Sequence, residues 1–411
     1  MTNRFFVLFK FLSLVSITST AVAEPGLEWQ ELEQQELEDL KAWVKQLEQQ
    51  ATNSKPAPEA KESIRLGGAL RFQYSHREYD RSNEQQGGVM ELDTLRLNLD
   101  GEIGGMILSA EYRHYDYMDV IHHAWVGYQF SPTVIGRAGI IKVPFGNQPY
   151  NSNNFFFSSN YYLGLEDDYD LGLGASYQGD AWQADLALLK NDERGGSDSY
   201  SRYSYDLVGV RGASEGINDR PAQVVTETNT LVGRVVRHWS TDGFDLDVGA
   251  SALYGSLYDH NSGDDDGDYQ AWAAHLDADW QRWNLKLQVS QYDYSFAEYS
   301  PLMAVGAYAF YDTIAAEATT LTAGIARTID WHAGPIDGIT IYSDFSEVRN
   351  KSGGLPNTWM NVTGVAISAG PVYTYIDWVT ARNHPFIGGS MGDSNSGSVN
   401  HRLNINVGYY F

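Results

Sequence analysis

The chain has 411 residues, no cysteine and a formal net charge of −25 at pH 7. The absence of cysteine excludes a disulfide framework and cysteine-ligated metals. The acidic balance argues against nucleic acid as a partner, because binding phosphates requires clustered Lys and Arg. Aromatic residues make up 13 % of the chain although its mean hydropathy is negative. This combination is too aromatic for a disordered chain and too polar for helical membrane spans, whereas the alternating strands of a membrane β-barrel account for both.

The first residues have the pattern of a secretory signal. Arg4 and Lys10 supply positive charge around an apolar run, and Ala-Val-Ala at 21–23 matches a small-x-small cleavage site. The apolar run is too short for a membrane anchor and is interrupted by Lys10. We therefore predict that residues 1–23 are a cleaved signal peptide and that the protein is exported.

The next segment changes to a helical pattern. Its apolar residues recur at spacings of three and four, at Leu37, Leu40, Val44 and Leu47. This spacing predicts a short periplasmic α-helix within 24–52, which either forms a coiled coil with the helices of a trimer or is a solvated amphipathic helix. Residues 53–63, with Pro56 and Pro58, are predicted to be a linker.

From residue 64 to 411 the period of the apolar residues is two. The final stretch shows it most clearly, because Leu403, Ile405, Val407, Tyr409 and Phe411 alternate with Arg402, Asn404, Asn406, Gly408 and Tyr410. Successive side chains of a strand take opposite faces, so such segments have one apolar and one polar face. Many Tyr and Trp residues lie near the ends of the apolar rows, as in the interfacial girdles of membrane barrels. The fold class is therefore all-β, a transmembrane antiparallel β-barrel.

The connections between these segments alternate between short and long. Tight turns are predicted at 104–105, 131–132, 179–180, 241–243, 281–282, 332–335 and 370–371. Long polar loops are predicted near 81–88, 143–167, 191–225, 257–267, 296–313, 347–357 and 382–398. Short periplasmic turns and longer extracellular loops are typical of outer-membrane barrels, and the spacing predicts about sixteen strands. Residues 203–211 are either a strand or part of a loop that folds inward.

One stretch resembles a known family. Residues 137–146 end in Lys142, Pro144, Phe145 and Gly146 in the order Lys-Val-Pro-Phe-Gly, and this motif resembles the phosphate-selective porin O and P family. Residues 95–101 and 111–113 look like the paired early strands of the same family. The resemblance implies a trimeric, sixteen-stranded outer-membrane channel in which the loop at 143–167 folds into the pore and narrows it.

The charges of that loop depart from the family. No Lys or Arg occurs from residue 143 to 189, where phosphate-selective members have basic residues. Carboxylates in a narrow passage repel anions. The predicted pore-lining residues are the loop acids Glu166, Asp167, Asp168 and Asp170 and the wall residues Arg71, Arg96, Glu111, Arg113 and Arg137. We expect a transverse field between arginines and acids, with weak cation preference.

Three other groups of residues could bind ligands. The loop at 145–164 combines amides with aromatics, which suits sugars or aromatic solutes, but the aromatic run Phe155–Phe157 also fits simple packing against the inner wall. Asp264, Asp266 and Asp268 form a weak calcium-loop candidate that lacks the distant bidentate Glu, so a solvated acidic tip fits better. His122 and His123 are adjacent on a predicted strand, so their rings are expected on opposite faces. No spacing indicates a catalytic triad, a cofactor or a metal centre.

These observations favour an outer-membrane porin of a Gram-negative bacterium that forms a water-filled channel for passive diffusion of small hydrophilic solutes and ions. The expected partners are membrane lipids, lipopolysaccharide and two further copies in a homotrimer. The alternative is a substrate-specific porin for phosphate, organic anions or sugars. A more distant alternative is an outer-membrane enzyme or adhesin built on a barrel scaffold.

Overall fold

The computed structural model describes residues 63–194, 201–208, 225–259 and 262–411. They belong to one compact unit, Lys61–Phe411. The predicted signal peptide at 1–23, the helix at 24–52 and all but the last residue of the linker at 53–63 lie outside the described residues. Among the described helices, none is both long enough and apolar enough to cross a membrane.

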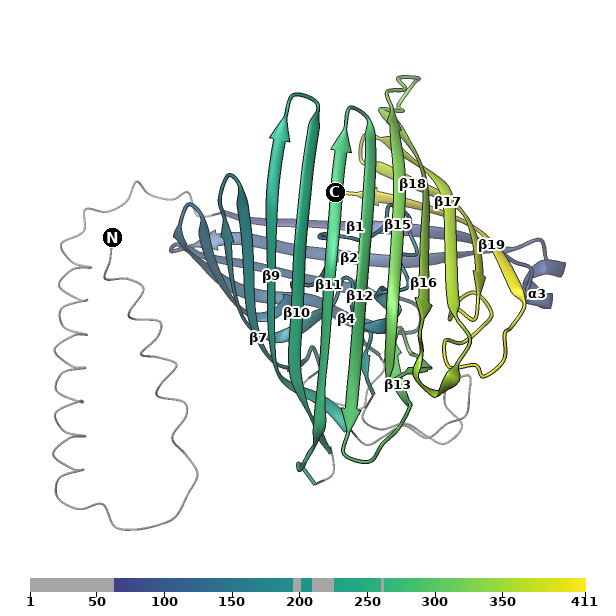
Figure 1. The fold of residues 1–411 in the computed structure, drawn as a ribbon. Helices are drawn as coiled ribbons and strands as arrows, with labels where there is room; N and C mark the ends of the chain where they lie inside the picture. The colour runs from purple at the N-terminus through teal and green to yellow at the C-terminus, as the bar shows by residue number, and fades with distance from the viewer. Residues whose placement is uncertain (1–62, 195–200, 209–224, 260–261) are drawn as a thin grey trace, which may run out of the picture. The chain divides into compact units, whose positions relative to one another are not determined.

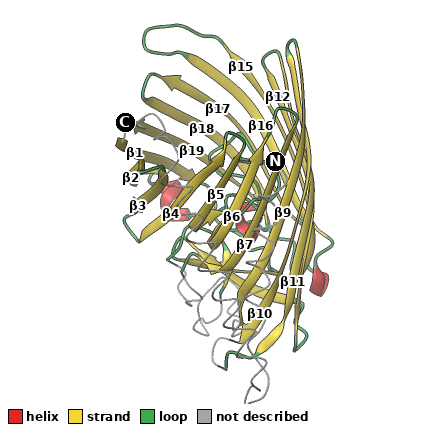
Figure 2. Cartoon of the chain, turned by 90° about the vertical axis from the view of Figure 1, so that its left-hand side faces the viewer, coloured by secondary structure: helices red, strands yellow, loops and turns green. Residues whose placement is uncertain are grey.

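Within the described ranges, sixteen antiparallel strands form a closed barrel (Figure 1 and Figure 2). They are β1 (Ser63–Arg77), β2 (Val89–Ile103), β3 (Met106–His114), β4 (Asp119–Ser131), β5 (Val134–Lys142), β6 (Tyr169–Gln178), β7 (Trp182–Asp192), β9 (Val225–Thr241), β10 (Phe244–Asp259), β11 (Asp265–Trp280), β12 (Trp283–Phe296), β15 (Glu317–Ile329), β16 (Gly338–Arg349), β17 (Thr358–Ala369), β18 (Val372–Arg382) and β19 (Val399–Tyr410). Each pairs with its neighbours in this order, and β1 pairs with β19. The prediction of an all-β barrel of about sixteen strands is confirmed.

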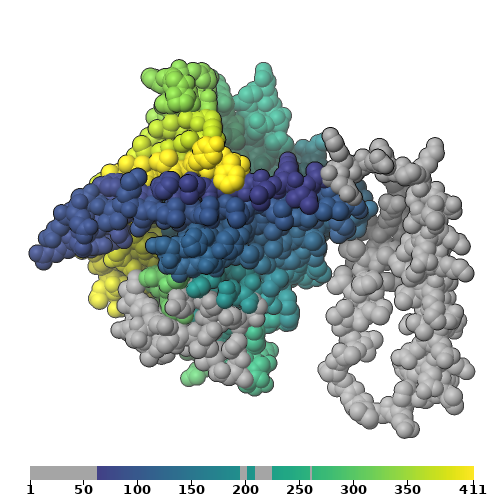
Figure 3. All heavy atoms as spheres, turned by 180° about the vertical axis from the view of Figure 1, so that it is seen from behind, coloured from purple at the N-terminus to yellow at the C-terminus, as the bar shows by residue number. Residues whose placement is uncertain are grey.

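The last strand closes the barrel. It pairs with β1 in a register that places Phe72 opposite Val407, and the backbone of Phe411 exchanges hydrogen bonds of 2.9 and 3.1 Å with that of Gly68. Figure 3 shows the yellow C-terminal residues against the purple and blue N-terminal strands. Closure pairs the backbone groups that an open sheet edge would leave free.

The alternation of side chains matches the prediction for the terminal strand. Val407, Tyr409 and Phe411 are exposed on the outside, whereas Asn404 and Asn406 are buried inside. The same outward apolar face continues around the wall at Leu97, Val126, Leu173, Leu186, Leu231, Trp272, Ile341 and Trp378, all of which are exposed. The barrel therefore presents large apolar side chains outward and polar ones to its lumen.

The turns and loops lie where the sequence predicts them. Every predicted tight turn joins two consecutive barrel strands, and every predicted long loop joins strands at the opposite end of the wall. One connection was missed, that of residues 115–118 between β3 and β4. This connection is a turn of four residues, in which the backbone N–H of Tyr115 donates to the carbonyl of Met118. It is too short to contain the polar stretch by which the other loops are predicted.

A second, small sheet is separate from the barrel wall. It contains β8 (Asp206–Leu207), β13 (Leu302–Ala307) and β14 (Phe310–Ala315). Of the two readings of 203–211, the described part provides the short strand β8, which pairs with β13 and not with the wall. The described helices are α3 (Arg81–Gln85), η1 (Tyr161–Leu163) and η2 (Ser352–Gly354). The Asp80 carboxylate begins α3 by accepting hydrogen bonds from the backbone of Ser82 and Asn83.

The buried core lies inside the barrel, where loops pack on one another. The hydroxyl of Tyr161 in η1 donates to the carbonyl of Tyr203 at 2.9 Å, and its oxygen lies 3.0 Å from the hydroxyl oxygen of Tyr308. Tyr203, Tyr205, Ile314, Ile387 and Met391 are almost fully buried in the same cluster. The loop after β5, the segment at 201–208 and the β13–β14 hairpin thus share one core with the loop after β18.

Candidate functional site

The loop that joins β5 to β6, residues 143–168, crosses the lumen; we call it the inner loop. It begins at the Lys-Val-Pro-Phe-Gly motif. The Gly146 backbone has φ 64°, its N–H donates to Ser251 Oγ at 2.9 Å, and its carbonyl accepts from Arg234 Nε at 2.8 Å. Positive φ favours glycine, because other residues pay a steric cost there. The motif therefore turns the chain from β5 towards β9 and β10 across the barrel.

The other motif residues support this turn. Phe145 is buried in the core, and Pro144 lines a cavity of the lumen described below. Lys142 Nζ donates to the carbonyl of Pro149 at 2.7 Å and forms an ion pair of 2.6 Å with Asp167. One lysine thus ties the beginning of the inner loop to its end.

Asn147 is the main anchor of the loop on the far wall. Its side-chain nitrogen donates to the carbonyls of Leu276 and Leu287, both at 3.2 Å, which are paired residues of β11 and β12. Its backbone N–H donates to Gln288 Oε1 at 2.9 Å, and its side-chain oxygen lies 3.1 Å from His275 Nδ1. A buried amide with so many partners fixes the position of the backbone that carries it.

The tip of the loop is attached further around the wall. Asn151 Nδ2 donates to Thr322 Oγ1 at 2.7 Å. Asn153 and Asn154 both donate to the Asp344 carboxylate, at distances of 2.8 and 2.9 Å. Ser159 then bonds Ser346. The inner loop is therefore held by β15 and β16 as well as by β9 to β12, and it divides the lumen.

The acids at the end of the loop do not face the open space beside it. Glu166 is buried and accepts from the backbone N–H groups of Asn151 and Ser158 at 2.9 and 3.1 Å and from the Ser158 hydroxyl. Burial raises the pKa of Glu166, and these hydrogen bonds oppose the rise. Asp167 forms an ion pair with Lys142 and accepts a hydrogen bond of 2.6 Å from the Tyr203 hydroxyl. Both carboxylates therefore bind other groups of the protein and stabilise the fold of the inner loop.

Asp168 and Asp170 lie at the end of the inner loop and the start of β6. Both are buried, and they line a small cavity together with Asp206 and Glu227. None of the four acids from Glu166 to Asp170 lines the larger cavity on the other side of the inner loop. The expected transverse field between these acids and the wall arginines is therefore not what the described geometry shows. Sequence alternation places strand residues on a face, but it carries no information on how a loop folds.

The cavity on this other side of the inner loop, which we call the channel cavity, has a volume of about 380 Å³. One side is formed by β1, β2, β3 and β19 and carries Arg71, Arg96, Arg113 and Arg402, with Asp93 as the acid among the lining residues. The other side is the inner loop with Phe155, Phe156 and Phe157. Predicted residues Arg71, Arg96 and Arg113 are thus brought together, whereas Arg402 was not among the predicted site residues. The alternation of the terminal strand already placed Arg402 on the polar face and could have found it.

Acids on the wall neutralise part of this arginine cluster. Arg71 Nε lies 2.7 Å from Asp93 Oδ2. Glu111 lies between two arginines, 2.5 Å from Arg113 Nε and 3.5 Å from Arg96 Nε. Arg402 donates to the Asn404 side-chain oxygen at 3.0 Å, and no described Asp or Glu lies within ion-pair distance of it. Arg402 therefore contributes a positive charge that no described acid pairs with directly.

The aromatic tip of the loop lies against these cations. The guanidinium of Arg71 lies over the Phe155 ring, 5.4 Å from its centre. Tyr115, Tyr117, Tyr150 and Tyr308 add further rings to the cavity lining. Phe155 and Phe156 therefore pack on the wall, as the simpler interpretation held, whereas Phe157 packs on Tyr161 of the same loop. All three also line the open space.

Arg137 lies in a different part of the lumen. It lines a cavity of about 630 Å³ next to β4 to β7, which also includes Pro144 and Lys142. Its guanidinium donates to Ser176 Oγ at 3.1 Å and lies over the Trp125 ring. Arg137 therefore does not belong to the arginine cluster of the channel cavity.

Two further expectations concern possible metal ligands. His122 and His123 do not point to opposite faces, since their Nδ1 atoms lie 2.9 Å apart. A β-bulge in the β3–β4 pairing leaves His122 without a partner residue and turns its ring to the side of His123 and Glu111. Asp264, Asp266 and Asp268 do not form a cluster of three ligand atoms within the described ranges.

Comparison with known proteins supports the fold. No model of a protein family matches the sequence, and no curated protein matches it in sequence. Among solved structures, the outer membrane channel DcaP of Acinetobacter baumannii is 11% identical, with a TM-score of 0.54 over 86% of this chain and 99% of that one. The anion-selective porin of Comamonas acidovorans is 9% identical, with a TM-score of 0.53 over 85% and 100%. OmpT, an outer membrane protein of Vibrio cholerae in its trimer form, is 9% identical, with a TM-score of 0.52 over 85% and 99%.

At these identities the likeness shows the fold and not a shared activity. The chain has the closed β-barrel fold of outer-membrane porins. None of the three structures is described as phosphate-selective, so the resemblance to the phosphate-selective family stays a prediction.

Proposed function

We propose that the chain is an outer-membrane porin through which small hydrophilic solutes diffuse passively. Its outward apolar side chains suit contact with lipid, and its lumenal polar side chains suit contact with water. Sixteen strands enclose a lumen wide enough for an aqueous path. The inner loop narrows that path, since it crosses from β5 to the opposite wall.

The same fold argues for the location and assembly of the protein. The neighbouring structures are outer-membrane proteins, and OmpT is described in a trimer form. We propose an outer-membrane homotrimer of a Gram-negative bacterium, surrounded by lipid and lipopolysaccharide. These neighbours include a channel and a porin, which favours a channel over the enzyme or adhesin alternative.

The arginine cluster of the channel cavity is the observation that indicates which ions the pore prefers. Four arginines and one aspartate line it, and Arg402 has no described acidic partner. Charged rings and walls set the selectivity of pores because Coulomb interactions are strong where water is restricted. We therefore propose that the pore prefers anions, in contrast to the weak cation preference expected from the net charge of the chain.

Planar-bilayer recording tests this proposal. Purified protein is expected to insert with conductance steps in groups of three, and a KCl gradient should give a reversal potential of anion-selective sign. The Arg402→Gln variant should shift this potential towards cations, whereas Arg81→Gln, at an exposed position of α3, should not. Cation selectivity of the wild-type protein would overturn the anion preference, and a lack of conductance would overturn the channel itself.

A second, narrower function is favoured by the aromatic side of the same cavity. Flat apolar rings face the arginines at Phe155 and Phe156, a pairing that suits an organic anion with a planar apolar part. We propose aromatic carboxylates as preferred solutes. Benzoate should lower the single-channel current more strongly than inorganic phosphate or glucose, and benzyl alcohol serves as the uncharged control. Equal effects of all four solutes would contradict a preference for aromatic carboxylates and would support general diffusion instead.

A further inference from the structure

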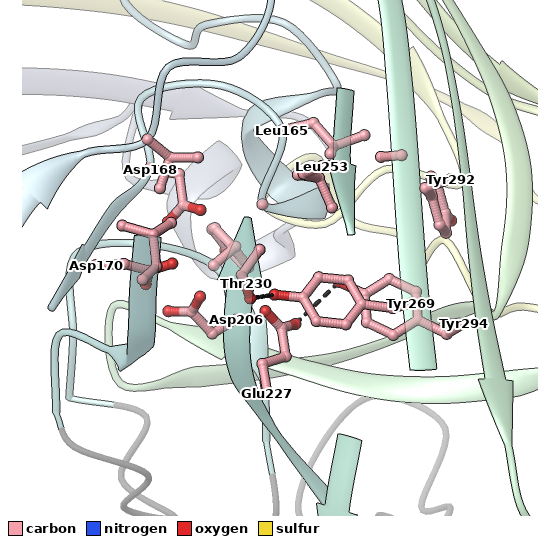
Figure 4. A pocket seen from close by; sticks show the side chains of 15 residues that line it. Leu165, Asp168, Asp170, Asp206, Glu227, Thr230, Leu253, Tyr269, Tyr292 and Tyr294 are labelled. Atoms are coloured by element: carbon pink, nitrogen blue, oxygen red, sulfur yellow. Dashed lines mark hydrogen bonds between the residues drawn. The ribbon is translucent and has the colours of Figure 1, made fainter. Parts of the chain in front are cut away.

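A cluster of buried carboxylates lies on the far side of the inner loop from the channel cavity. Asp168 ends the inner loop, Asp170 lies at the start of β6, and Asp206 lies in β8 (Figure 4). One oxygen of each carboxylate lies within 4.8 Å of the other two, and all three residues are buried. Glu227, at the start of β9, lines the same cavity of about 20 Å³. We call this arrangement the acidic pocket.

The acidic pocket has too little positive charge of its own. Arg202 is the cation that contacts it, and its guanidinium pairs with Asp192 at 2.6 Å and with Asp206 at 3.1 Å. Among the described residues, no Lys or Arg lies within ion-pair distance of Asp168 or Glu227. Burial raises the pKa of Asp168, and the neighbouring Asp206 raises it further. Several like charges in a dry site are unfavourable unless a cation or protons compensate them.

A second observation points to a missing partner. The Oδ1 atom of Asp170 is buried and has no hydrogen-bond partner among the described residues, and the residue is only 6 % exposed. Buried polar atoms in proteins nearly always have a partner. Figure 4 shows the Asp170 carboxylate turned towards those of Asp168 and Asp206. The carboxylate that carries the unpartnered oxygen therefore faces the other two acids of the cluster, and all three line the small cavity.

We propose that the acidic pocket binds a calcium ion through Asp168, Asp170 and Asp206. Two ligands of one ion can lie no further apart than twice the metal–oxygen distance, which is about 4.6–5.2 Å for Ca²⁺. The three oxygens meet this limit. Carboxylates are the ligands of hard cations, whereas Zn²⁺ prefers nitrogen and sulfur.

The size of the cavity favours Ca²⁺ over Mg²⁺. A volume of about 20 Å³ is close to the space that one water molecule needs. Mg²⁺ gives up its water shell reluctantly and usually keeps several waters, whereas Ca²⁺ accepts irregular sites made of protein oxygens. An enclosed site with little room for water therefore fits the larger, more easily dehydrated ion.

The ligands come from two separate segments, because Asp168 and Asp170 lie on either side of Tyr169 at the start of β6, and this gives the ion a structural role. Asp168 belongs to the inner loop, Asp170 to the barrel wall, and Asp206 to a strand that pairs with Gly306 of β13. A bound ion would tie the junction of the inner loop and β6 to the small sheet. Removing it would leave mutually repelling carboxylates at that junction. The binding of the ion does not depend on which solute the pore admits.

Terbium luminescence on the full-length, folded protein in detergent tests the proposal. Tyr269, Tyr292 and Tyr294 line the pocket, so their excitation should sensitise a bound Tb³⁺ ion. After treatment with EGTA, the wild-type protein should show one saturable Tb³⁺ site from which Ca²⁺ displaces the probe more effectively than Mg²⁺. The Asp170→Asn variant should bind Tb³⁺ at least tenfold more weakly.

A matched control separates this site from other acidic segments. Asp264 is exposed at the start of the acidic stretch 264–268, and the Asp264→Asn variant should bind Tb³⁺ as the wild-type protein does. Asp170→Asn is expected to fold, because asparagine has nearly the same size and removes one charge from the cluster. Circular dichroism should confirm this, and Ca²⁺ should raise the Tm of the wild-type protein but not that of Asp170→Asn.

Three results would overturn the proposal. They are the absence of a saturable Tb³⁺ site in the wild-type protein, unchanged affinity in Asp170→Asn, and loss of the site in Asp264→Asn alone. Infrared spectra offer an independent check. A protonated carboxyl band that Asp170→Asn removes, and that is the same in EGTA and in Ca²⁺ in the wild-type protein, would show that shared protons, not a metal ion, compensate the charges.

Discussion

The guanidinium of Arg402 lies over the ring of Phe156, 4.9 Å from its centre. Arg402 belongs to β19, the strand that closes the barrel, and Phe156 belongs to the tip of the inner loop. The contact therefore joins the last strand of the wall to the segment that narrows the lumen. Arg402 is largely buried but is one of the residues that line the channel cavity, so the loop positions a cation that acts on solutes in that cavity.

The first prediction concerns this contact. Replacing Phe156 with leucine keeps an apolar side chain but removes the ring, and a partly buried cation–π contact contributes about 1 kcal/mol. We expect benzoate to block Phe156→Leu about fivefold more weakly than the wild-type pore, which corresponds to about 1 kcal/mol. Single-channel recording with increasing benzoate measures this. Phe130→Leu, on the exposed outer face, should leave the block unchanged, and an equal loss in both variants would contradict the assigned contact.

The second prediction concerns Asn147, the anchor of the inner loop on β11 and β12. The Asn147→Ala variant loses the bonds to two strand carbonyls and the contact with His275. Leaving buried polar groups without partners costs about 1–3 kcal/mol each. We expect a lower Tm, a larger mean conductance and noisier current, because the loop is less firmly held across the lumen. Asn395→Ala, at an exposed loop position, is the control, and identical conductance of the two variants would argue against anchoring.

The third prediction separates backbone strain from steric clash at Gly146. Its φ is 64°, and a Cβ added there would lie 2.4 Å from Gln288 Oε1. Gly334 has nearly the same φ of 62° but open space around it. In both alanine variants the free energy of unfolding should fall by about 1–2 kcal/mol, because alanine is strained in the left-handed backbone conformation. Only Gly146→Ala should displace Gln288, lower the Tm further and change the conductance.

The barrel could be predicted from sequence because its determinants are local and periodic. A strand repeats every two residues, so the alternation of Leu403 to Phe411 already separates the lipid-facing from the lumenal side chains. Turns at glycine and proline pairs, such as 104–105 and 370–371, mark where each strand ends. The arginines Arg71, Arg96 and Arg113 lie in such strands, and the structure brings them to one cavity.

The acids of the inner loop could not be placed in this way. Residues 166–170 follow one another directly, yet Glu166 bonds Ser158, Asp167 bonds Lys142 and Asp168 lies in the acidic pocket. These partners depend on the path of a loop that has no period. The bulge at His122 is a similar case, since one extra residue reverses the faces that strict alternation predicts.

The fourth prediction concerns a buried carboxylate in the small sheet. Asp312 in β14 accepts hydrogen bonds from the Ser390 hydroxyl and, at 3.1 Å, from the backbone N–H of Met391 in the loop after β18. Burial raises its pKa from 3.8 to about 6, although these bonds and nearby Lys351 oppose the rise. The docked loop therefore binds a proton more tightly than the released loop does. Docking should be most stable below pH 4 and should weaken as the pH rises through about 6.

The pKa difference sets an upper limit of about 3 kcal/mol on this effect. Burial lowers the pKa of Lys351 to about 8 and that of His384 to about 4, so neither group titrates between pH 5 and 7. Hydrogen exchange of residues 383–398, corrected for intrinsic rates, should show greater protection at pH 5 than at pH 7. Asp312→Asn, which cannot ionise, should remove this difference, whereas Asp393→Asn in the same loop should retain it. Equal pH dependence in the wild-type protein and Asp312→Asn would mean that another group controls the docking of this loop.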